Sequence, residues 1–359
     1  MMEPKQAEPL ARRTTLEVGG AAEHFVEAES VDELCDALAW AGERDQPVAI
    51  LGGGSNVVVA DEGLSGLVIV VANRGIELES GHDGVRLTAA AGEPWDEVVA
   101  AAVGENLAGI ECLSGIPGTV GATPIQNVGA YGQEVGSVIE HVRVLHRETL
   151  EERVLTPAEC RFGYRSSALK QPGNPWVVTE MAVRLEPGGA PCLSYAQVAE
   201  RFPGPRTPSL GELRAAVLEL RRSKSMVLDD DDPNRRSAGS FFTNPVVDED
   251  GFEGVAASAR ALGVLGLDEV PPGHPVGEGR TKLSAGWLIE RAGFPRGAVR
   301  GNVGLSTKHA LALVNRGGAT AAELVAFAVE IRRGVRSHLG VDLTPEPVFL
   351  GFESPDPTC

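Results

Sequence analysis

Apolar residues recur at helical spacing in three segments that share one polar start signal. A serine or threonine followed three residues later by glutamate stands before each segment, at Ser30, Ser209 and Thr320. Such a pair satisfies the free backbone N–H groups of a first helical turn. The pattern predicts helices over residues 31 to about 44, 209–222 and 320–339, and Pro94 is well placed to open a fourth through about residue 103.

Short apolar runs rich in β-branched residues predict the strands. They cover residues 47–51, 67–71, 85–89, 142–145, 177–185 and 310–314. Strands and helices do not alternate regularly, as they would in a doubly wound sheet. The sequence therefore predicts an α+β fold.

The length of 359 residues is typical of roughly two to three domains. Composition changes at Ala72–Gly75 and at Leu228–Pro233, and both places are predicted domain boundaries. The second contains four consecutive aspartates, which we interpret as a solvated linker.

The net charge of −18 argues against nucleic acid or an anionic membrane as partner. No apolar run approaches the roughly 20 residues that span a bilayer, and the first nine residues are unlike a secretory signal. Five widely spaced cysteines include no C-x-x-C pair, so we expect no zinc or other metal site and no disulfide framework. A reducing cytoplasm is the predicted location.

Two glycine-rich loops, Leu51–Asn56 and Gly115–Gly132, are the strongest signal for a ligand. Glycine lets backbone N–H groups approach an anion closely. The first loop lacks the third glycine of a Rossmann fingerprint and leads into a strand, and the chain has no P-loop motif. An ordinary turn stays open as an interpretation of the first loop alone. Together the loops predict a dinucleotide cofactor held between them.

Five ordered motifs resemble those of the UDP-N-acetylenolpyruvoylglucosamine reductase family. They are GGGSN, GIPGTVGATPIQNVGAYG, CRFGYRSS, SAGSFFTNP and TPEPVF, and they span nearly the whole chain. The resemblance implies a two-part FAD-binding module of the PCMH/vanillyl-alcohol-oxidase type and a C-terminal α+β substrate-binding domain. The implied domains are residues 1–72 with 346–359, residues 73–227 and residues 228–345.

The resemblance also implies the reaction, in which NADPH reduces FAD and the flavin N5 delivers hydride to C3 of an enolpyruvyl ether. The product would be UDP-N-acetylmuramate, a peptidoglycan precursor, and the enzyme a monomer. FAD is expected to bind non-covalently, because neither loop offers histidine or cysteine. The implied cofactor contacts are Gly52, Gly53, Gly54, Ser55, Asn56, Val57, Ser114, Gly115, Pro117, Gly118, Gly121, Ala122, Thr123, Ile125, Gln126, Asn127, Gly129 and Ala130.

Three residues match the family's catalytic positions. Arg165 is expected to stabilise an enolate-like intermediate together with Glu346, and Ser240 to donate the proton to C2. The resemblance assigns substrate contacts to Tyr131, Tyr195, Lys224, Asn244 and Glu290, with Tyr195 on a loop that closes over substrate in one subtype.

Two alternatives stay open. One is a related FAD oxidase, in which Cys112, just upstream of the second loop, could anchor the cofactor covalently. The other is a non-catalytic module that binds nucleotide sugars. All proposed ligands are anionic, so positive charge must be local; the available clusters are Arg161, Arg165 and Lys170; Arg221, Arg222 and Lys224; and Arg235 and Arg236.

Overall fold

The computed structural model describes residues 3–359, which divide into two compact units. The first unit contains the chain up to Glu8, then Ala22–Gly54 and Ser65–Leu228. The second contains Pro9–Ala21, Ser55–Leu64 and Asp229–Cys359. Two short N-terminal segments therefore fold with the C-terminal third of the chain. The three-domain division given above, whose first two residues lie outside the described residues, stays a prediction.

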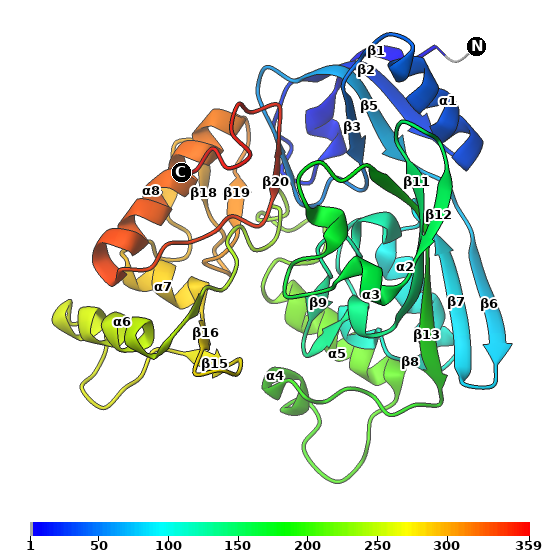
Figure 1. Cartoon of the computed structure of the whole chain (residues 1–359). Coiled ribbons are helices and arrows are strands. Elements are labelled where there is room, and N and C mark those ends of the chain that lie inside the picture. Colours follow the sequence, from blue (N-terminus) through cyan, green and yellow to red (C-terminus); the bar gives the residue numbers. More distant parts are fainter. Residues whose placement is uncertain (1–2) are drawn as a thin grey trace. The chain divides into compact units, whose positions relative to one another are not determined.

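A four-stranded sheet forms one part of the first unit, in the order β1-β2-β5-β3 (Figure 1). Its strands are β1 (Lys5–Pro9), β2 (Ala21–Ala28), β5 (Leu64–Val71) and β3 (Val48–Leu51), and β3 runs parallel to β5. Helix α1 (Val31–Gly42) begins at Ser30, whose side chain accepts a hydrogen bond from the Glu33 backbone N–H. Its buried face shares one hydrophobic core with this sheet.

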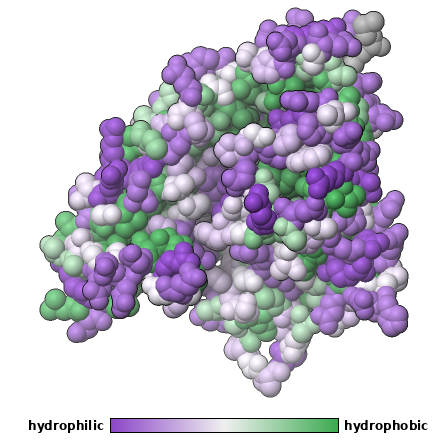
Figure 2. Space-filling view, viewed as in Figure 1, coloured by the Kyte–Doolittle hydropathy of each residue, from purple (hydrophilic) through white to green (hydrophobic). Residues whose placement is uncertain are grey.

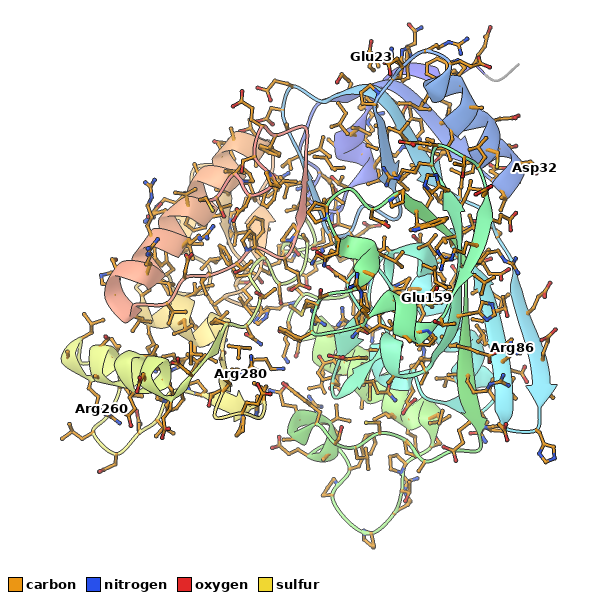
Figure 3. All side chains as sticks on the ribbon, viewed as in Figure 1. Glu23, Asp32, Arg86, Glu159, Arg260 and Arg280 are labelled. Carbon is orange, nitrogen blue, oxygen red and sulfur yellow. The ribbon has the colours of Figure 1, made fainter. Side chains whose placement is uncertain are left out.

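A larger antiparallel sheet, β12-β11-β13-β7-β6 with β8 beside β13, forms the rest of that core. The strands are β6 (Ile76–Gly81), β7 (Gly84–Ala90), β8 (Leu107–Ala108), β11 (Ile139–His146), β12 (Glu152–Leu155) and β13 (Trp176–Pro187). Arg86 on β7, labelled in Figure 3, pairs with Glu79 of the adjacent strand β6 and with Glu140 of β11, on the far side of β13. Helices α2 (Trp95–Gly104), α3 (Pro157–Cys160), α4 (Ala196–Ala199) and α5 (Leu210–Arg222) and the short hairpin β9 (Gly129–Ala130) and β10 (Gln133–Glu134) complete the unit.

The second unit combines three small sheets with three helices. The sheets are β14-β16-β15, β17-β18-β19 and the parallel pair β20-β4. Their strands are β4 (Val57–Val59), β14 (Val246–Val247), β15 (Gly273–Pro275), β16 (Thr281–Leu283), β17 (Val299–Arg300), β18 (Val303–Leu305), β19 (Leu313–Asn315) and β20 (Val348–Leu350), and the helices are α6 (Glu249–Ala261), α7 (Ala285–Arg291) and α8 (Ala321–Leu339). Leu324, Phe327 and Ile331 of α8 pack into the unit's core.

This mixture of helices and largely antiparallel strands confirms the predicted α+β class. The strand predicted over residues 310–314 is wrong in its first half, because β19 begins at Leu313. Leu311 is buried, but its carbonyl accepts from the Phe241 N–H instead of joining that sheet. The apolar run at residues 310–314 therefore indicated burial correctly but did not predict which of its residues pair in a sheet.

The interpretation of the four aspartates as a solvated linker is also partly wrong. Asp232 is buried and forms an ion pair of 2.8 Å with the Lys308 Nζ. The same carboxylate accepts hydrogen bonds from the backbone and side chain of Asn234, which in turn bonds Thr307. One member of the acidic run thus anchors the start of the C-terminal chain.

No helix in the part of the chain from residue 3 onward is both long and apolar enough to cross a membrane. Apolar side chains do reach the surface after α6, where Leu267 and Val270 are exposed. Figure 2 shows hydrophobic surface on that part of the second unit.

Candidate active site

The two glycine-rich loops meet within the first unit. An alanine Cβ built on Gly52 would lie 2.7 Å from the Thr119 Oγ1, and one on Gly53 would lie 2.8 Å from the Gly118 Cα. The Gly118 carbonyl accepts a hydrogen bond of 3.0 Å from the Trp95 N–H. Because Trp95 is fully buried at the start of α2, the second loop cannot easily retreat. The glycines are therefore needed where one loop backbone touches the other.

The start of the second loop is fixed by a charged pair. Asp96 on α2 accepts a hydrogen bond of 2.5 Å from the Gly115 N–H and pairs with both terminal nitrogens of Arg214 on α5, at 2.6 and 2.8 Å. Burial acts to raise the pKa of Asp96, but the bonds from Arg214 and Gly115 outweigh it and the pKa is lowered. The carboxylate is thus held ionised beside the loop.

Asn127, a predicted cofactor contact, is buried and uses its side chain to hold the loop. Its Nδ2 donates to the Glu134 carboxylate at 2.9 Å and to the Gly163 carbonyl at 3.1 Å. Its Oδ1 accepts from the Gly136 N–H at 2.8 Å. Both polar atoms of the amide therefore have partners within the protein, and its contact with a cofactor stays a prediction.

The predicted cofactor residues are distributed over both units, because the boundary between the units falls between Gly54 and Ser55 of the first loop. Gly52–Gly54 and Ser114–Ala130 belong to the first unit, whereas Ser55, Asn56 and Val57 belong to the second. Ser114 and Thr123 are buried, and each hydroxyl donates to a backbone carbonyl, of Glu111 and Val120 respectively. Their side chains thus shape the loop.

Arg165 lies in the first unit beside the end of the second loop. Its Nη2 donates to the Gly129 carbonyl at 2.9 Å, and its backbone has the left-handed φ of 51°. The guanidinium lies over the Tyr164 ring, 5.4 Å from its centroid. A strained backbone that is held by tertiary contacts is common at functional sites.

A cluster of aromatic and basic side chains includes Tyr131, near the same end of this loop. The rings of Tyr131 and Tyr195 meet edge to face, with centroids 5.4 Å apart. The Lys224 Nζ lies 5.5 Å from the centroid of the Tyr131 ring and donates to the Gln197 Oε1 at 2.8 Å. Three predicted substrate residues are thus brought together, and half-burial of a lysine among them suits an anionic ligand.

Burial sets the charge properties of this cluster. It lowers the pKa of Lys224, with the nearby charge of Arg221 acting in the same direction, and it raises the pKa of Tyr131. Arg221 is itself buried beside Gly115, and its Nε has no hydrogen-bond partner among the described residues. A buried donor without a partner is costly, so this nitrogen is suited to an acceptor on a bound molecule.

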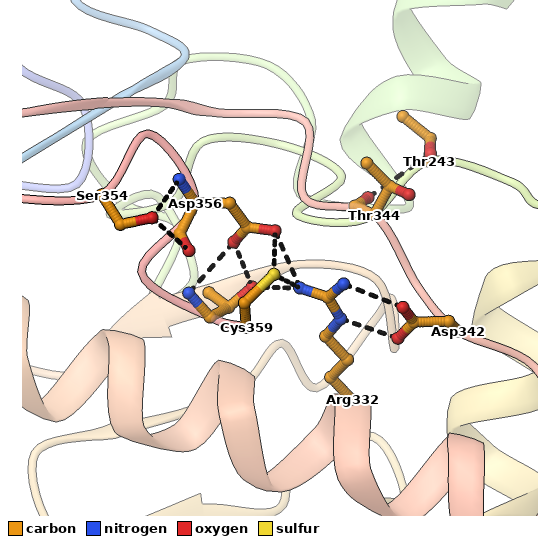
Figure 4. A network of polar contacts seen from close by, with 8 residues as sticks. Thr243, Arg332, Asp342, Thr344, Ser354, Asp356 and Cys359 are labelled. Atoms are coloured by element: carbon orange, nitrogen blue, oxygen red, sulfur yellow. Dashed lines mark hydrogen bonds and ion pairs between the residues drawn. The ribbon is translucent and has the colours of Figure 1, made fainter.

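Ser240 and Glu346 come together in the second unit, although 106 residues separate them in sequence. The Glu346 N–H donates to the Phe241 carbonyl at 2.9 Å, and Phe242 pairs with Pro345 as an antiparallel bridge. The backbone N–H and hydroxyl of Thr243 both donate to the Thr344 carbonyl (Figure 4). The motif that carries Ser240 therefore lies alongside the segment that carries Glu346.

Arg332 on α8 holds both ends of that C-terminal segment, as Figure 4 shows. It forms ion pairs with Asp342 at 2.7 Å and with Asp356 at 2.8 Å. Hydrogen bonding to Arg332 lowers the pKa of Asp342. Glu346 therefore lies on a stretch of chain that is anchored before and after it.

The two remaining predicted substrate residues lie at opposite ends of α7. The Asn244 Oδ1 accepts from the Ala285 N–H at 2.9 Å, in the first turn of the helix. Glu290 forms an ion pair of 3.0 Å with Arg296 near the other end. Both side chains thus have protein partners, and their substrate contacts stay predictions.

Sequence reasoning missed the residues that support the site. Asp96 and Arg214 are 118 residues apart and stand in ordinary helical sequence, so no local signal links them. Glu111, fully buried, accepts from the Gly109 and Cys192 N–H groups and joins the second loop to the Tyr195 loop. Cys112 is buried as well, and burial raises the pKa of its thiol, which keeps it unreactive.

Two family models match the chain. The C-terminal domain of UDP-N-acetylenolpyruvoylglucosamine reductase matches residues 231–350, and an FAD binding domain matches residues 22–149. The two matches fall mainly on the second and first units, respectively.

Similar proteins cover nearly the whole chain. A UDP-N-acetylenolpyruvoylglucosamine reductase of Thermobifida fusca is 48% identical over 348 residues, 96% of this chain and 97% of that protein. One of Streptomyces avermitilis is 46% identical over 350 residues, with 96% and 94% covered. The crystal structure of the UDP-N-acetylenolpyruvylglucosamine reductase of Thermus caldophilus has a TM-score of 0.64 at 26% identity, covering 98% of this chain and 100% of that one.

Proposed function

Because this chain belongs to the UDP-N-acetylenolpyruvoylglucosamine reductase family, we propose that it reduces the enolpyruvyl ether of UDP-N-acetylglucosamine to UDP-N-acetylmuramate with NADPH. Membership makes the chain an FAD-dependent oxidoreductase of peptidoglycan precursor synthesis with a two-part FAD-binding module. The observation that carries the proposal is the pairing of the Ser240 motif with the Glu346 segment.

The residues present fit FAD. The glycine loops expose backbone where Gly53 faces Gly118, and the Arg221 Nε is a buried donor without a described partner beside Gly115. When bound, the flavin supplies the hydride-transfer chemistry that no side chain offers. We propose that the two loops hold FAD non-covalently. Acid precipitation should then leave the flavin in the supernatant, and flavin retained by the pellet would contradict this part of the proposal.

The chain's own residues orient the substrate and manage charge and protons. Arg165 carries a permanent positive charge and a fork of donors that suits the substrate carboxylate. Glu346 is proposed to polarise the same intermediate as a donor, and the Ser240 Oγ to deliver its proton to C2. An aliphatic hydroxyl is a weak acid, but an enolate carbon is basic enough to accept its proton. The Lys224 ammonium and the Tyr131 and Tyr195 rings are proposed to bind the anionic nucleotide sugar.

We further propose that the enzyme acts as a cytoplasmic monomer without nucleic-acid or membrane partners. The support is the net charge of −18 and the five dispersed cysteines, all of them free thiols. Size-exclusion chromatography with light scattering tests the oligomeric state, and a mass of twice 37.6 kDa would contradict the monomer.

The test of the central proposal separates the two half-reactions by stopped-flow absorbance. Ser240→Ala should lose its flavin absorbance with NADPH at close to the normal rate, because no proton from Ser240 is needed at that stage. Its reoxidation by the enolpyruvyl substrate should be slower by about 10²–10⁴-fold, as for a lost general acid. The control is Ser337→Ala on the exposed face of α8, which should match the unaltered protein in both phases.

Two outcomes would contradict the role of Ser240. Full-speed reoxidation of Ser240→Ala would show that water or another group supplies the proton. Failure of both half-reactions would show that the serine turn serves to hold the cofactor. An unaltered protein that neither binds flavin nor oxidises NADPH would overturn the proposed function itself.

A further inference from the structure

The N-terminal segment Thr14–Val18 is a fixed part of the second unit. Leu16 and Val18 are fully buried in its core. The Asn315 Nδ2 donates to the carbonyls of Leu16 and Glu17, at 2.9 and 3.2 Å. This short strap is therefore held by its side chains and by its backbone.

Charge anchors the strap to the chain just before the Ser240 motif. The Glu17 carboxylate accepts a hydrogen bond of 2.6 Å from the Arg235 Nη1 and another from the Arg236 Nε. Both arginines directly precede Ser237, the first residue of the motif Ser237–Pro245. The strap thus has a defined position relative to this motif.

Thr15 lies between the Ser240 motif and the first glycine-rich loop. Its Oγ1 is 2.7 Å from the Ser237 carbonyl oxygen and 3.3 Å from the Ser55 carbonyl oxygen. A hydroxyl has one proton, so it donates mainly to the nearer oxygen of Ser237. Ser55 is the first residue of that loop to belong to the second unit.

The Thr15 contacts complete a closed series of contacts that includes Ser240 and Glu346, the predicted catalytic residues of this unit. From Ser55 the chain passes to Asn56, whose Nδ2 donates to the Glu346 carbonyl at 3.3 Å. The Glu346 N–H donates to the Phe241 carbonyl, next to Ser240. The chain from Phe241 back to Ser237 returns to Thr15. The Thr15 hydroxyl supplies the last two links, a hydrogen bond to Ser237 and a longer, weaker contact of 3.3 Å with the Ser55 carbonyl oxygen.

We propose that Thr15 is a positioning residue, whose hydroxyl sets the place of the Ser240 Oγ relative to Ser55 and to Glu346. The inference rests on the proposed function. The span from Ala238 to Ser240 is only three residues long and includes Gly239, with a φ of 70°. One end is fixed at Phe241, where the backbone pairs with Glu346. The Thr15 bond restrains the other end.

The rest of the structure limits what loss of this bond can do. Ser237 also pairs with Val314 as an antiparallel bridge, so the motif stays attached to its unit without Thr15. The expected result is a displacement of Ser240 within a folded protein. Displacements on the order of 1 Å can slow an enzymatic step by about 10²-fold.

The test compares Thr15→Val, which keeps the shape and removes the hydroxyl, with Thr15→Ser, which keeps the hydroxyl. Thr15→Val should bind FAD and be reduced by NADPH at rates within twofold of the unaltered protein. Its reoxidation by the enolpyruvyl substrate should slow by roughly 10- to 100-fold. The solvent deuterium isotope effect on that phase should increase, because proton delivery to C2 is the step made worse. Thr15→Ser should restore the reoxidation rate.

The matched control is Thr14→Val, one residue earlier. The Thr14 hydroxyl donates to the Ala11 carbonyl at 3.5 Å, and within residues 3–359 it makes no hydrogen bond to the Ser240 motif. This variant should behave as the unaltered protein does in both half-reactions. If Thr15→Val does not fold, Thr15→Ala replaces it with the same expectation.

Reoxidation at the unaltered rate in the hydroxyl-free variant would overturn the inference, as would an equal slowing of both half-reactions with an unchanged isotope effect. The second result would show that Thr15 only stabilises the fold. If the unaltered protein binds flavin but is not reoxidised by the enolpyruvyl ether, the proposed function fails, and the inference fails with it for that separate reason.

Discussion

Replacing Gly53 by alanine tests whether the two glycine-rich loops must touch. The new Cβ would lie 2.8 Å from the Gly118 Cα, whereas carbon atoms in good contact are about 3.5–4.0 Å apart. The loops would have to separate by at least about 0.7 Å, the difference between these distances. Gly53 has no positive φ, so the steric contact is the main effect of the substitution.

Gly118 is poorly able to move away. Its carbonyl is bonded to the N–H of the buried Trp95, and its own φ of 109° is a conformation that only glycine adopts readily. Overpacking of this kind costs about 1–3 kcal/mol. If the loops stay together, this cost lowers the free energy of unfolding. If they separate, it weakens FAD binding instead and raises the Kd roughly 5- to 150-fold.

The assay is titration of the flavin-free protein with FAD, followed by flavin fluorescence, together with thermal unfolding of the flavin-free and loaded forms. Gly104→Ala is the matched control, because Gly104 ends α2 and, apart from its chain neighbours and its own helix backbone, no described heavy atom lies within 4 Å of its built Cβ. That change should be neutral or stabilise by up to about 1 kcal/mol. A Gly53→Ala variant with the Kd and melting temperature of the unaltered protein would refute the reasoning.

Three further predictions concern charge and protonation. Arg165→Lys keeps the charge but loses the planar fork of donors, so reoxidation by substrate should slow by about 10²-fold or more in stopped-flow measurements, and near-normal turnover would contradict the assigned role. Asp96→Asn leaves the largely buried Arg214 without its ion pair, and urea unfolding should show a loss of about 1–2 kcal/mol, with an unchanged midpoint contradicting the structure. Burial raises the pKa of the Cys160 thiol from its ordinary value of 9.0 to about 11. The thiol therefore ionises at a lower pH in the unfolded chain than in the folded one. Its contribution to the free energy of unfolding is complete below about pH 9 and is lost as the pH rises towards 11. The urea midpoint should therefore fall over that window, and less so in Cys160→Ala.

Local signals in the sequence predicted the elements that carry their own start signal and apolar face. The serine and threonine caps at Ser30, Ser209 and Thr320 each accept a bond from the N–H of the glutamate three residues on. Cap and apolar face lie within about four residues of each other, so neighbouring sequence determines them. The strands β2, β6 and β12 were not predicted. In β6, Ile76 and Leu78 alternate with Glu77 and Glu79, but the strand is exposed along its whole length and has only these two large apolar residues.

Longer-range arrangements could not be read in the same way. The sequence identified Ser240 and Glu346 through motifs, but their adjacency depends on a backbone pairing between Phe241 and Glu346. Asp232 illustrates the same limit, since its three aspartate neighbours are exposed and its burial is favourable through the distant Lys308 together with Asn234. The folding of residues 9–21 and 55–64 with the C-terminal chain likewise has no local signature.

The sequence by itself determined the helices α1, α2, α5 and α8, the strands β3, β5, β7, β11 and β13, the two glycine-rich loops and the residues that match a reductase family. It did so because caps, periodicity and glycine spacing act over a few neighbouring residues. Only the tertiary structure decided that Gly53 faces Gly118, that Asp96 holds Gly115 and that Thr15 joins Ser55 to Ser237. Those contacts link residues that are 19 to 222 positions apart, and their energies depend on burial and distance that exist only once the chain has folded.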